Sequence, residues 1–200
     1  ISTSSGVLNI NANSSTLSLA SGITLSSAGA LTLAAGSTSS SGVLNLTSTA
    51  STINVNNKLV STGAINMSAA SGLTLSNNTL TAAGNISLEA DSTNSGSGQL
   101  TLASGTTITS SAGSITLGAT TGGISSAGSL TLNASNGITV GDSLTTAGAV
   151  NIDADTDNNG SGDFTLSTGS LSTTNNALTV TANDLVLSGT LDSGTGSTTI

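Results

Sequence analysis

The chain has 200 residues with a net charge of −8 and contains one Lys and nine acidic residues, but no Arg, His, Cys, Pro, Trp or Tyr. Without a cationic surface it cannot neutralise phosphates, which excludes nucleic acid and disfavours anionic membranes as partners. Without His or Cys it cannot form a Ser-His-Asp or Cys-His catalytic group, and it has no disulfide or zinc-thiolate site.

Hydrolysis of polysaccharides is the remaining enzymatic alternative, because two carboxylates can cleave a glycosidic bond. The acidic residues, however, gather in one segment, the chain offers no aromatic platform for a sugar, and Lys58 alone cannot neutralise an acidic polysaccharide. The apolar runs are too short for a transmembrane helix or a signal-peptide core within these residues. We therefore expect a protein without catalysis or a required cofactor, with no nucleic-acid partner and no membrane insertion in this segment.

Apolar residues at alternate positions recur along the whole chain, and Ser, Thr or Asn usually stands between them. Such alternation puts both apolar side chains on one face of a strand and the middle side chain on the other. In chain order the pairs are Leu8/Ile10, Leu17/Leu19, Ile23/Leu25, Leu31/Leu33, Leu44/Leu46, Ile53/Val55, Ile65/Met67, Leu73/Leu75, Ile86/Leu88, Leu100/Leu102, Ile115/Leu117, Leu130/Leu132, Ile138/Val140, Val150/Ile152, Phe164/Leu166, Leu178/Val180 and Leu185/Leu187. The pattern predicts an all-β protein of many short strands.

Similar segments also return at nearly constant intervals. Residues 4–10, SSGVLNI, return at 40–46 as SSGVLNL, and a Gly corner between two strands recurs at 58–67, 122–132 and 142–152. Repeats of about 20 residues are typical of a solenoid in which each unit contacts only its neighbours. Corresponding apolar positions lie 20 or 21 residues apart in three series: Leu44, Ile65 and Ile86; Leu59 and Leu80; Leu130 and Val150.

This periodicity predicts a single continuous right-handed parallel β-helix over residues 1–200, with three short strands in each coil of about 20–22 residues. Leu, Ile and Val would stack inside it, and Gly, Ser, Thr and Asn would form the corners. About nine coils would give a rod on the order of 40–45 Å long. The pattern does not define the strands between residues 31 and 59 or between 115 and 130, and the 13-residue step from Leu31 to Leu44 resembles a long corner loop.

Two other structural classes are weaker alternatives. A sandwich or barrel would need hairpin signals and would rarely repeat one segment so faithfully. The Ser/Gly/Thr-rich composition is compatible with disorder, but only 5% of the residues are charged. The periodic apolar pairs also supply surface whose burial can offset the entropy of ordering the chain.

Residues 153–163, DADTDNNGSGD, contain four of the nine acidic residues. Asp153, Asp155, Asp157 and Asp163, with a Gly for the bend, resemble the oxygen-rich spacing of calcium loops. The Gly falls at the eighth position rather than the sixth, and no Glu stands at the twelfth. Two interpretations therefore stay open, which are a calcium site formed by these four carboxylates and a solvated acidic turn.

An internal copy of this segment bears on the choice. Residues 152–166 align without a gap with residues 88–102, LEADSTNSGSGQLTL, and both segments end their excursion with Gly-Ser-Gly. In the earlier copy, Thr93 and Gln99 stand where the later copy has Asp157 and Asp163. Because the excursion exists with half of the carboxylates, we expect a structural corner loop at which calcium is optional.

The outward positions and the one aromatic residue allow two further expectations. Thr occupies the middle position of many strands, and a regular Thr array on a β-solenoid would be able to bind ice. Asn45, Asn66 and Ser87 interrupt the array, and the preference of β-branched residues for exposed strand faces explains the Thr content more simply. Phe164 stands in register with the apolar positions, so we expect it in the core.

Residues 125–155, SSAGSLTLNASNGITVGDSLTTAGAVNIDAD, and 84–91, GNISLEAD, resemble the repeat regions of large bacterial surface exoproteins. These are the filamentous-haemagglutinin-like and autotransporter-type adhesins. The resemblance is one of repeat style and composition, covers essentially the whole chain and carries no catalytic motif. It implies a right-handed β-helix in a secreted or surface-attached rod, which holds an adhesive tip away from the cell or packs into fibres.

The ends of the sequence show no polar capping helix, and an uncapped β-helix exposes unpaired strand edges. We expect residues 1–200 to be a section of a longer chain, or a subunit that self-associates end to end or laterally. The expected function is that of a structural rod or fibre module outside the cell or on its surface. The alternative is a solenoid that binds a glycan, a host protein or ice through one outward face, and an exposed apolar patch would favour that alternative.

Overall fold

The computed structural model of the chain describes residues 1–76, 79–120 and 122–200. These residues form 27 short strands and no helix, which confirms the all-β prediction. Accordingly, this part of the chain contains no helix with the length and apolar character needed to cross a membrane. The strands form three parallel sheets of nine strands each.

Every third strand belongs to the same sheet, so three successive strands complete one coil. Sheet A contains β1 (Ser2–Thr3), β4 (Ile23–Ser27), β7 (Leu44–Ser48), β10 (Ile65–Ala69), β13 (Ile86–Glu89), β16 (Ile115–Gly118), β19 (Ile138–Val140), β22 (Phe164–Leu166) and β25 (Leu185–Leu187). Sheet B contains β2 (Leu8–Asn11), β5 (Leu31–Ala34), β8 (Ile53–Val55), β11 (Leu73–Leu75), β14 (Leu100–Leu102), β17 (Ile124–Ser126), β20 (Leu144–Thr146), β23 (Ser170–Ser172) and β26 (Thr190–Asp192). Sheet C contains β3 (Thr16–Leu19), β6 (Ser37–Ser40), β9 (Lys58–Ser61), β12 (Thr79–Ala82), β15 (Thr106–Ser110), β18 (Leu130–Ala134), β21 (Val150–Asp153), β24 (Leu178–Thr181) and β27 (Thr198–Thr199).

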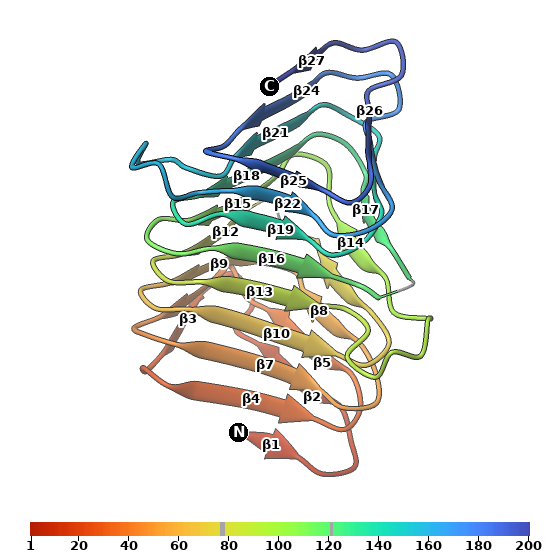
Figure 1. The fold of residues 1–200 in the computed structure, drawn as a ribbon. Coiled ribbons are helices and arrows are strands. Elements are labelled where there is room, and N and C mark those ends of the chain that lie inside the picture. The colour runs from red at the N-terminus through yellow and green to blue at the C-terminus, as the bar shows by residue number, and fades with distance from the viewer. Residues whose placement is uncertain (77–78, 121) are drawn as a thin grey trace.

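The chain winds as a right-handed coil (Figure 1). It runs along sheet A at the front from left to right, turns back through sheet B on the right, and returns leftward through sheet C at the back, one level higher. The predicted parallel β-helix with three strands in each coil is therefore confirmed. Because hydrogen bonds between coils run along the axis, the structure is a stack in which each coil pairs only with its neighbours.

The register of the sheets is the one that the sequence intervals predict. Ile65 pairs with Leu44 on one side and with Ile86 on the other. The other two predicted series are also paired, as Leu59 with Leu80 and Leu130 with Val150. Identical or similar side chains therefore lie directly above one another along the interior.

These stacked aliphatic side chains form one continuous core. Leu44 and Ile65 are fully buried, and Ile86 is 1% exposed. Phe164 is also fully buried, as predicted, and it lies between Ile138 and Leu185 in sheet A. Each such side chain contributes about 1.5–3 kcal/mol through burial, so the narrow interior can order a chain that is otherwise mostly Ser, Thr, Asn and Gly.

The two segments in which the sequence pattern left the strands undefined each contain one strand of the regular series. The 13-residue step from Leu31 to Leu44 is not a long loop, because β6 lies within it and pairs with β3 and β9. Between residues 115 and 130, the corresponding strand is β17. Strand β6 has the sequence STSS, without any aliphatic residue. Backbone hydrogen bonds to both neighbours can hold such a strand, so the apolar pattern alone missed it.

Hydroxyl groups fix the corners at which strands of sheets A and C end. Ser48 Oγ donates to the carbonyl oxygen of Gly29 at 2.8 Å, and Ser110 Oγ donates to that of Gly84 at 2.8 Å. Both Gly residues belong to the preceding coil, so each bond ties two coils together. A Cβ on Gly63 would lie 2.6 Å from the backbone nitrogen of Val43, which explains why these corners require Gly.

Candidate functional site

Two long loops leave the regular coil, and they are the two copies identified in the sequence. Residues 90–99 connect β13 in sheet A to β14 in sheet B, whereas residues 154–163 connect β21 in sheet C to β22 in sheet A. In Figure 1 the first loop projects at the right and the second at the left. Strand β21 follows β13 by eight strands, which is not a multiple of three. The two copies therefore lie at different corners of the coil.

Asp91 organises the 90–99 loop from within. Its side chain is fully buried. Oδ1 accepts hydrogen bonds from the backbone N–H of Ser95 at 3.0 Å and from its hydroxyl at 2.9 Å, while Oδ2 accepts one from the N–H of Gly96 at 2.7 Å. Glu89 Oε1 in turn accepts the N–H of Asp91 at 2.9 Å. The carboxylate thus closes the loop on itself.

Asp155 does the same in the 154–163 loop. Its Oδ1 accepts the N–H of Asn159 at 3.1 Å and its Oδ2 accepts the N–H of Gly160 at 3.0 Å. Asp153 Oδ1 accepts the N–H of Asp155 at 3.3 Å, as Glu89 does for Asp91. Asp155 is 8% exposed, so this carboxylate also lies largely inside its loop.

The backbones of the two loops match as well. Asn94 and Asn158 have φ values of 53° and 51°, and Gly96 and Gly160 have φ values of 78° and 79°. A Cβ at either of the last Gly residues would collide with a carbonyl oxygen, that of Ala90 for Gly98 and that of Ala154 for Gly162. The repeated Gly-Ser-Gly therefore encodes one left-handed position and one close backbone approach.

The remaining predicted calcium ligands point to separate partners. Asp157 Oδ2 accepts a hydrogen bond from Asn159 Nδ2 at 2.8 Å, and Asp163 Oδ1 accepts one from Asn183 Nδ2 at 3.4 Å. Over the described residues, no three acidic side chains come close enough together to hold a metal ion. In this arrangement Asp153, Asp155, Asp157 and Asp163 do not form a set of ligands that fits calcium, because the most buried carboxylate already binds two N–H donors. Calcium binding stays a prediction, which the Discussion puts to a test.

Asp91 is the acidic group with the most altered proton affinity. Burial by itself raises the pKa of the Asp91 carboxyl, but hydrogen bonds from the N–H of Gly96 and from the hydroxyl and N–H of Ser95 stabilise the charged form. Together they hold this pKa below its ordinary value of 3.8. The loop is thus built around a carboxylate that stays ionised.

The residue beneath each anchoring Asp differs between the two loops. The N–H of Ser92 donates to the carbonyl oxygen of Ala69, and the N–H of Thr156 donates to that of Ala134, which places the loops over equivalent backbone. Ala70 therefore occupies the position below Asp91, and Ser135 the position below Asp155. Ser135 is 3% exposed and its hydroxyl has no hydrogen-bond partner. The 154–163 loop thus buries an unpaired polar group that the other loop lacks.

The outward face of sheet C carries two columns of polar side chains. Thr107 pairs in register with Thr79 and Thr131, and Thr109 pairs with Thr81 and Asn133. The sequence analysis considered only the residue between two apolar positions and so missed this second column. Thr-x-Thr in β12 and β15 was the available signal, because residues two apart in a strand share one face.

Large exposed apolar side chains are few on the described surface. They are Ile1, Val7, Val43, Val186, Leu187 and Ile200. Of these, only Val43 lies between residues 8 and 185, and it is 39% exposed. The described surface between these limits therefore offers no cluster of large apolar residues.

Comparison with known proteins adds no functional information. No protein-family model, no curated protein and no solved structure matches this chain. The fold and the two loops are therefore the features from which a function can be argued.

Proposed function

We propose that this protein is a structural rod module of an extracellular or cell-surface protein, without catalytic activity. The observation that carries the proposal is the continuity of the stack, in which all three sheets pass through nine coils. Each coil adds about 4.8 Å to the length. A solenoid of this kind sets a distance, and its length follows directly from the number of repeats.

Two further features support a spacer. Apart from Val43, the large apolar side chains between residues 8 and 185 are not exposed, whereas a protein-binding face usually presents an apolar patch. The excess of acidic residues also favours a rod that stays soluble. The resemblance to the repeat regions of filamentous-haemagglutinin-like and autotransporter-type adhesins points in the same direction and provides the proposed location.

Coils of the same kind are the partner that fits the ends of the three sheets. The outermost strands of each sheet have one edge without a neighbouring strand in the described residues, and such edges pair readily with another strand. We propose that coils of the same chain or of a second copy pair there in parallel. Lateral self-association lacks comparable support, because the outward faces are polar.

Insertion of extra coils tests the rod. Residues 44–64 comprise one coil of 21 residues, since Ile65 occupies the position above Leu44. Four additional tandem copies should lengthen the particle by about 19 Å in small-angle X-ray scattering and should not lower its melting temperature. The control carries the same 84 inserted residues (four times 21) in scrambled order. An insertion that unfolds the protein as the scrambled control does, or that leaves its length unchanged, would contradict the proposal.

The location has a separate test. An antibody raised against residues 1–200 should label intact cells of the source organism as strongly as permeabilised cells. Labelling that requires permeabilisation would remove the extracellular part of the proposal, while the rod itself would stand on the insertion experiment.

A binding face is the second candidate, and the two polar columns of sheet C favour it. Rows of hydroxyl groups about 4.8 Å apart along the rod and about 7 Å apart across it could meet a regular neutral surface such as ice or a crystalline glycan. Thr81→Lys with Thr109→Lys should then abolish inhibition of ice recrystallisation or binding to insoluble glycan. Thr116→Lys with Thr139→Lys on sheet A is the control. If the unmodified protein shows neither activity, the binding candidate is wrong.

A further inference from the structure

A polar pair interrupts the aliphatic interior where sheet B turns into sheet C. Thr38 in β6 occupies an inward position, in register with Leu17 and Leu59 of the neighbouring coils. Asn57, between β8 and β9, is 2% exposed, and Thr38 is 1% exposed. Asn57 Nδ2 donates a hydrogen bond to Thr38 Oγ1 at 2.6 Å. One half of the Asn57 amide is thereby satisfied by the preceding coil.

The other half of this amide has no protein partner. Asn57 Oδ1 is buried and accepts no hydrogen bond. Burying an amide oxygen without a hydrogen bond is unfavourable, and buried amides in folded proteins almost always find a partner in protein or in water. This oxygen therefore needs a donor that the neighbouring side chains do not supply.

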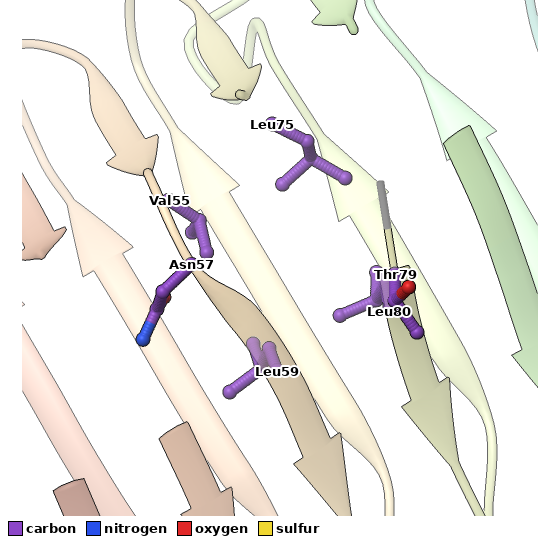
Figure 2. A pocket seen from close by; sticks show the side chains of 6 residues that line it. All are labelled: Val55, Asn57, Leu59, Leu75, Thr79 and Leu80. Atoms are coloured by element: carbon purple, nitrogen blue, oxygen red, sulfur yellow. The ribbon is translucent and has the colours of Figure 1, made fainter. Parts of the chain in front are cut away.

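A small cavity adjoins the same amide. Its volume is about 10 Å³, and it is lined by Val55, Asn57, Leu59, Leu75, Thr79 and Leu80. Figure 2 shows the amide nitrogen of Asn57 on the side away from Leu75, Thr79 and Leu80, which belong to the next coil. The unpaired half of the amide and the cavity thus lie at the junction of two coils.

The size and lining of the cavity restrict its occupant. One water molecule needs a cavity of about 10–15 Å³ and a few polar partners, and larger ligands do not fit such a volume. Asn57 and Thr79 are the polar side chains that line it. In either orientation of the amide, one polar atom bonds Thr38 and the other is left for the cavity.

We propose that this cavity is a binding site for a single ordered water molecule, held by the amide of Asn57. The water supplies the hydrogen bond that Asn57 Oδ1 lacks, and it joins the coil that contains Asn57 to the coil that contains Leu75 and Leu80. A polar group within an aliphatic ladder is thereby completed rather than left unpaired.

Crystal structures of the protein and of two variants test the proposal, at a resolution that shows ordered waters. We expect density for one water within hydrogen-bond distance of the Asn57 amide in the unmodified protein. It should persist in Thr38→Val, which leaves the cavity side of the amide intact, and disappear in Asn57→Leu. A cavity without density in the unmodified protein overturns the proposal. So does a water that remains in Asn57→Leu, because other groups would then hold it. If Asn57→Leu does not fold, the unmodified protein and Thr38→Val still decide the question.

Discussion

The carboxylates of Asp91 and Asp155 accept the same pair of backbone hydrogen bonds, although their loops lie at different corners of the coil. One loop joins sheet A to sheet B and the other joins sheet C to sheet A. The loop conformation therefore depends on its own residues and not on the sheets that it connects. Because each loop is closed by its own carboxylate, it is a self-contained insertion into a corner of the coil.

Replacement of the anchoring carboxylate should destabilise its loop. Asp155→Ala leaves the N–H groups of Asn159 and Gly160 without their acceptor. By analogy with the loss of a helix N-cap, we expect a decrease of about 1 kcal/mol in the free energy of unfolding, measured by urea denaturation.

Asp157→Ala is the matched control, because Asp157 accepts a bond only from the side chain of Asn159 in the described structure. This change should stay within about 0.5 kcal/mol of the unmodified protein. Equal losses from both substitutions would show that Asp155 is not the anchor of the loop.

Stability should depend on acid pH through Asp91. Its pKa in the folded protein lies below the ordinary value of 3.8 because of the hydrogen bonds from Gly96 and Ser95. A lowered folded pKa gives a stabilisation that is present above the unfolded pKa and is lost as the pH falls through the folded pKa. Asp91→Asn removes the titration.

The measurement is the difference in urea midpoint between the protein and Asp91→Asn across the pH range. We expect a constant difference from neutral pH down to about pH 5, and a decrease below that value. A difference that is independent of pH down to the most acidic conditions at which both proteins fold would exclude an ionised Asp91 as the source.

Calcium should have no effect on stability. Both oxygens of Asp155 already accept N–H groups, and no three acidic side chains of the described residues cluster. Melting temperatures measured with excess Ca²⁺ and with a chelator should therefore agree. A rise with Ca²⁺ that disappears in Asp157→Ala would instead establish the predicted calcium site and would require the loop to rearrange.

Two buried Ser residues should respond oppositely to removal of their hydroxyl. Ser110 Oγ donates to the carbonyl oxygen of Gly84, whereas Ser135 Oγ has no partner. We expect Ser110→Ala to cost about 1 kcal/mol, and Ser135→Ala to be neutral or stabilising. The second expectation follows from the other loop, in which Ala70 occupies the equivalent position. A loss for Ser135→Ala as large as that for Ser110→Ala would mean that its hydroxyl has a partner.

The sequence predicts much of the fold, because one periodicity determines the strand and another determines the coil. Leu44, Ile65 and Ile86 show both, since each begins an apolar pair and they follow one another at intervals of 21 residues. Strand β6 could not be found in this way. Its inward positions are Thr38 and Ser40, which are buried although polar, so no apolar alternation marks it.

The candidate site was predicted less completely. The internal copy identified the two loops and their structural character, but it could not show that Asp91 and Asp155 turn inward while Asp157 faces Asn159. That difference depends on which N–H groups the backbone presents, and it follows from left-handed residues such as Asn94 and Asn158. The corner at which each loop lies was also hidden, because the sequence repeat does not mark the sheet to which a strand belongs.

The distance between coils is the most direct test of the account. Thr24, Thr116 and Val186 are exposed on sheet A, in β4, β16 and β25, and these strands are four and seven positions apart in the sheet. The chain has no Cys, so spin labels can be attached to the double variants Thr24→Cys/Thr116→Cys and Thr24→Cys/Val186→Cys and measured by pulsed electron paramagnetic resonance. A rigid stack of parallel coils predicts narrow distributions near about 19 Å and about 34 Å. Distances that fail to grow with the number of coils, or broad distributions, would contradict a rod built by stacking.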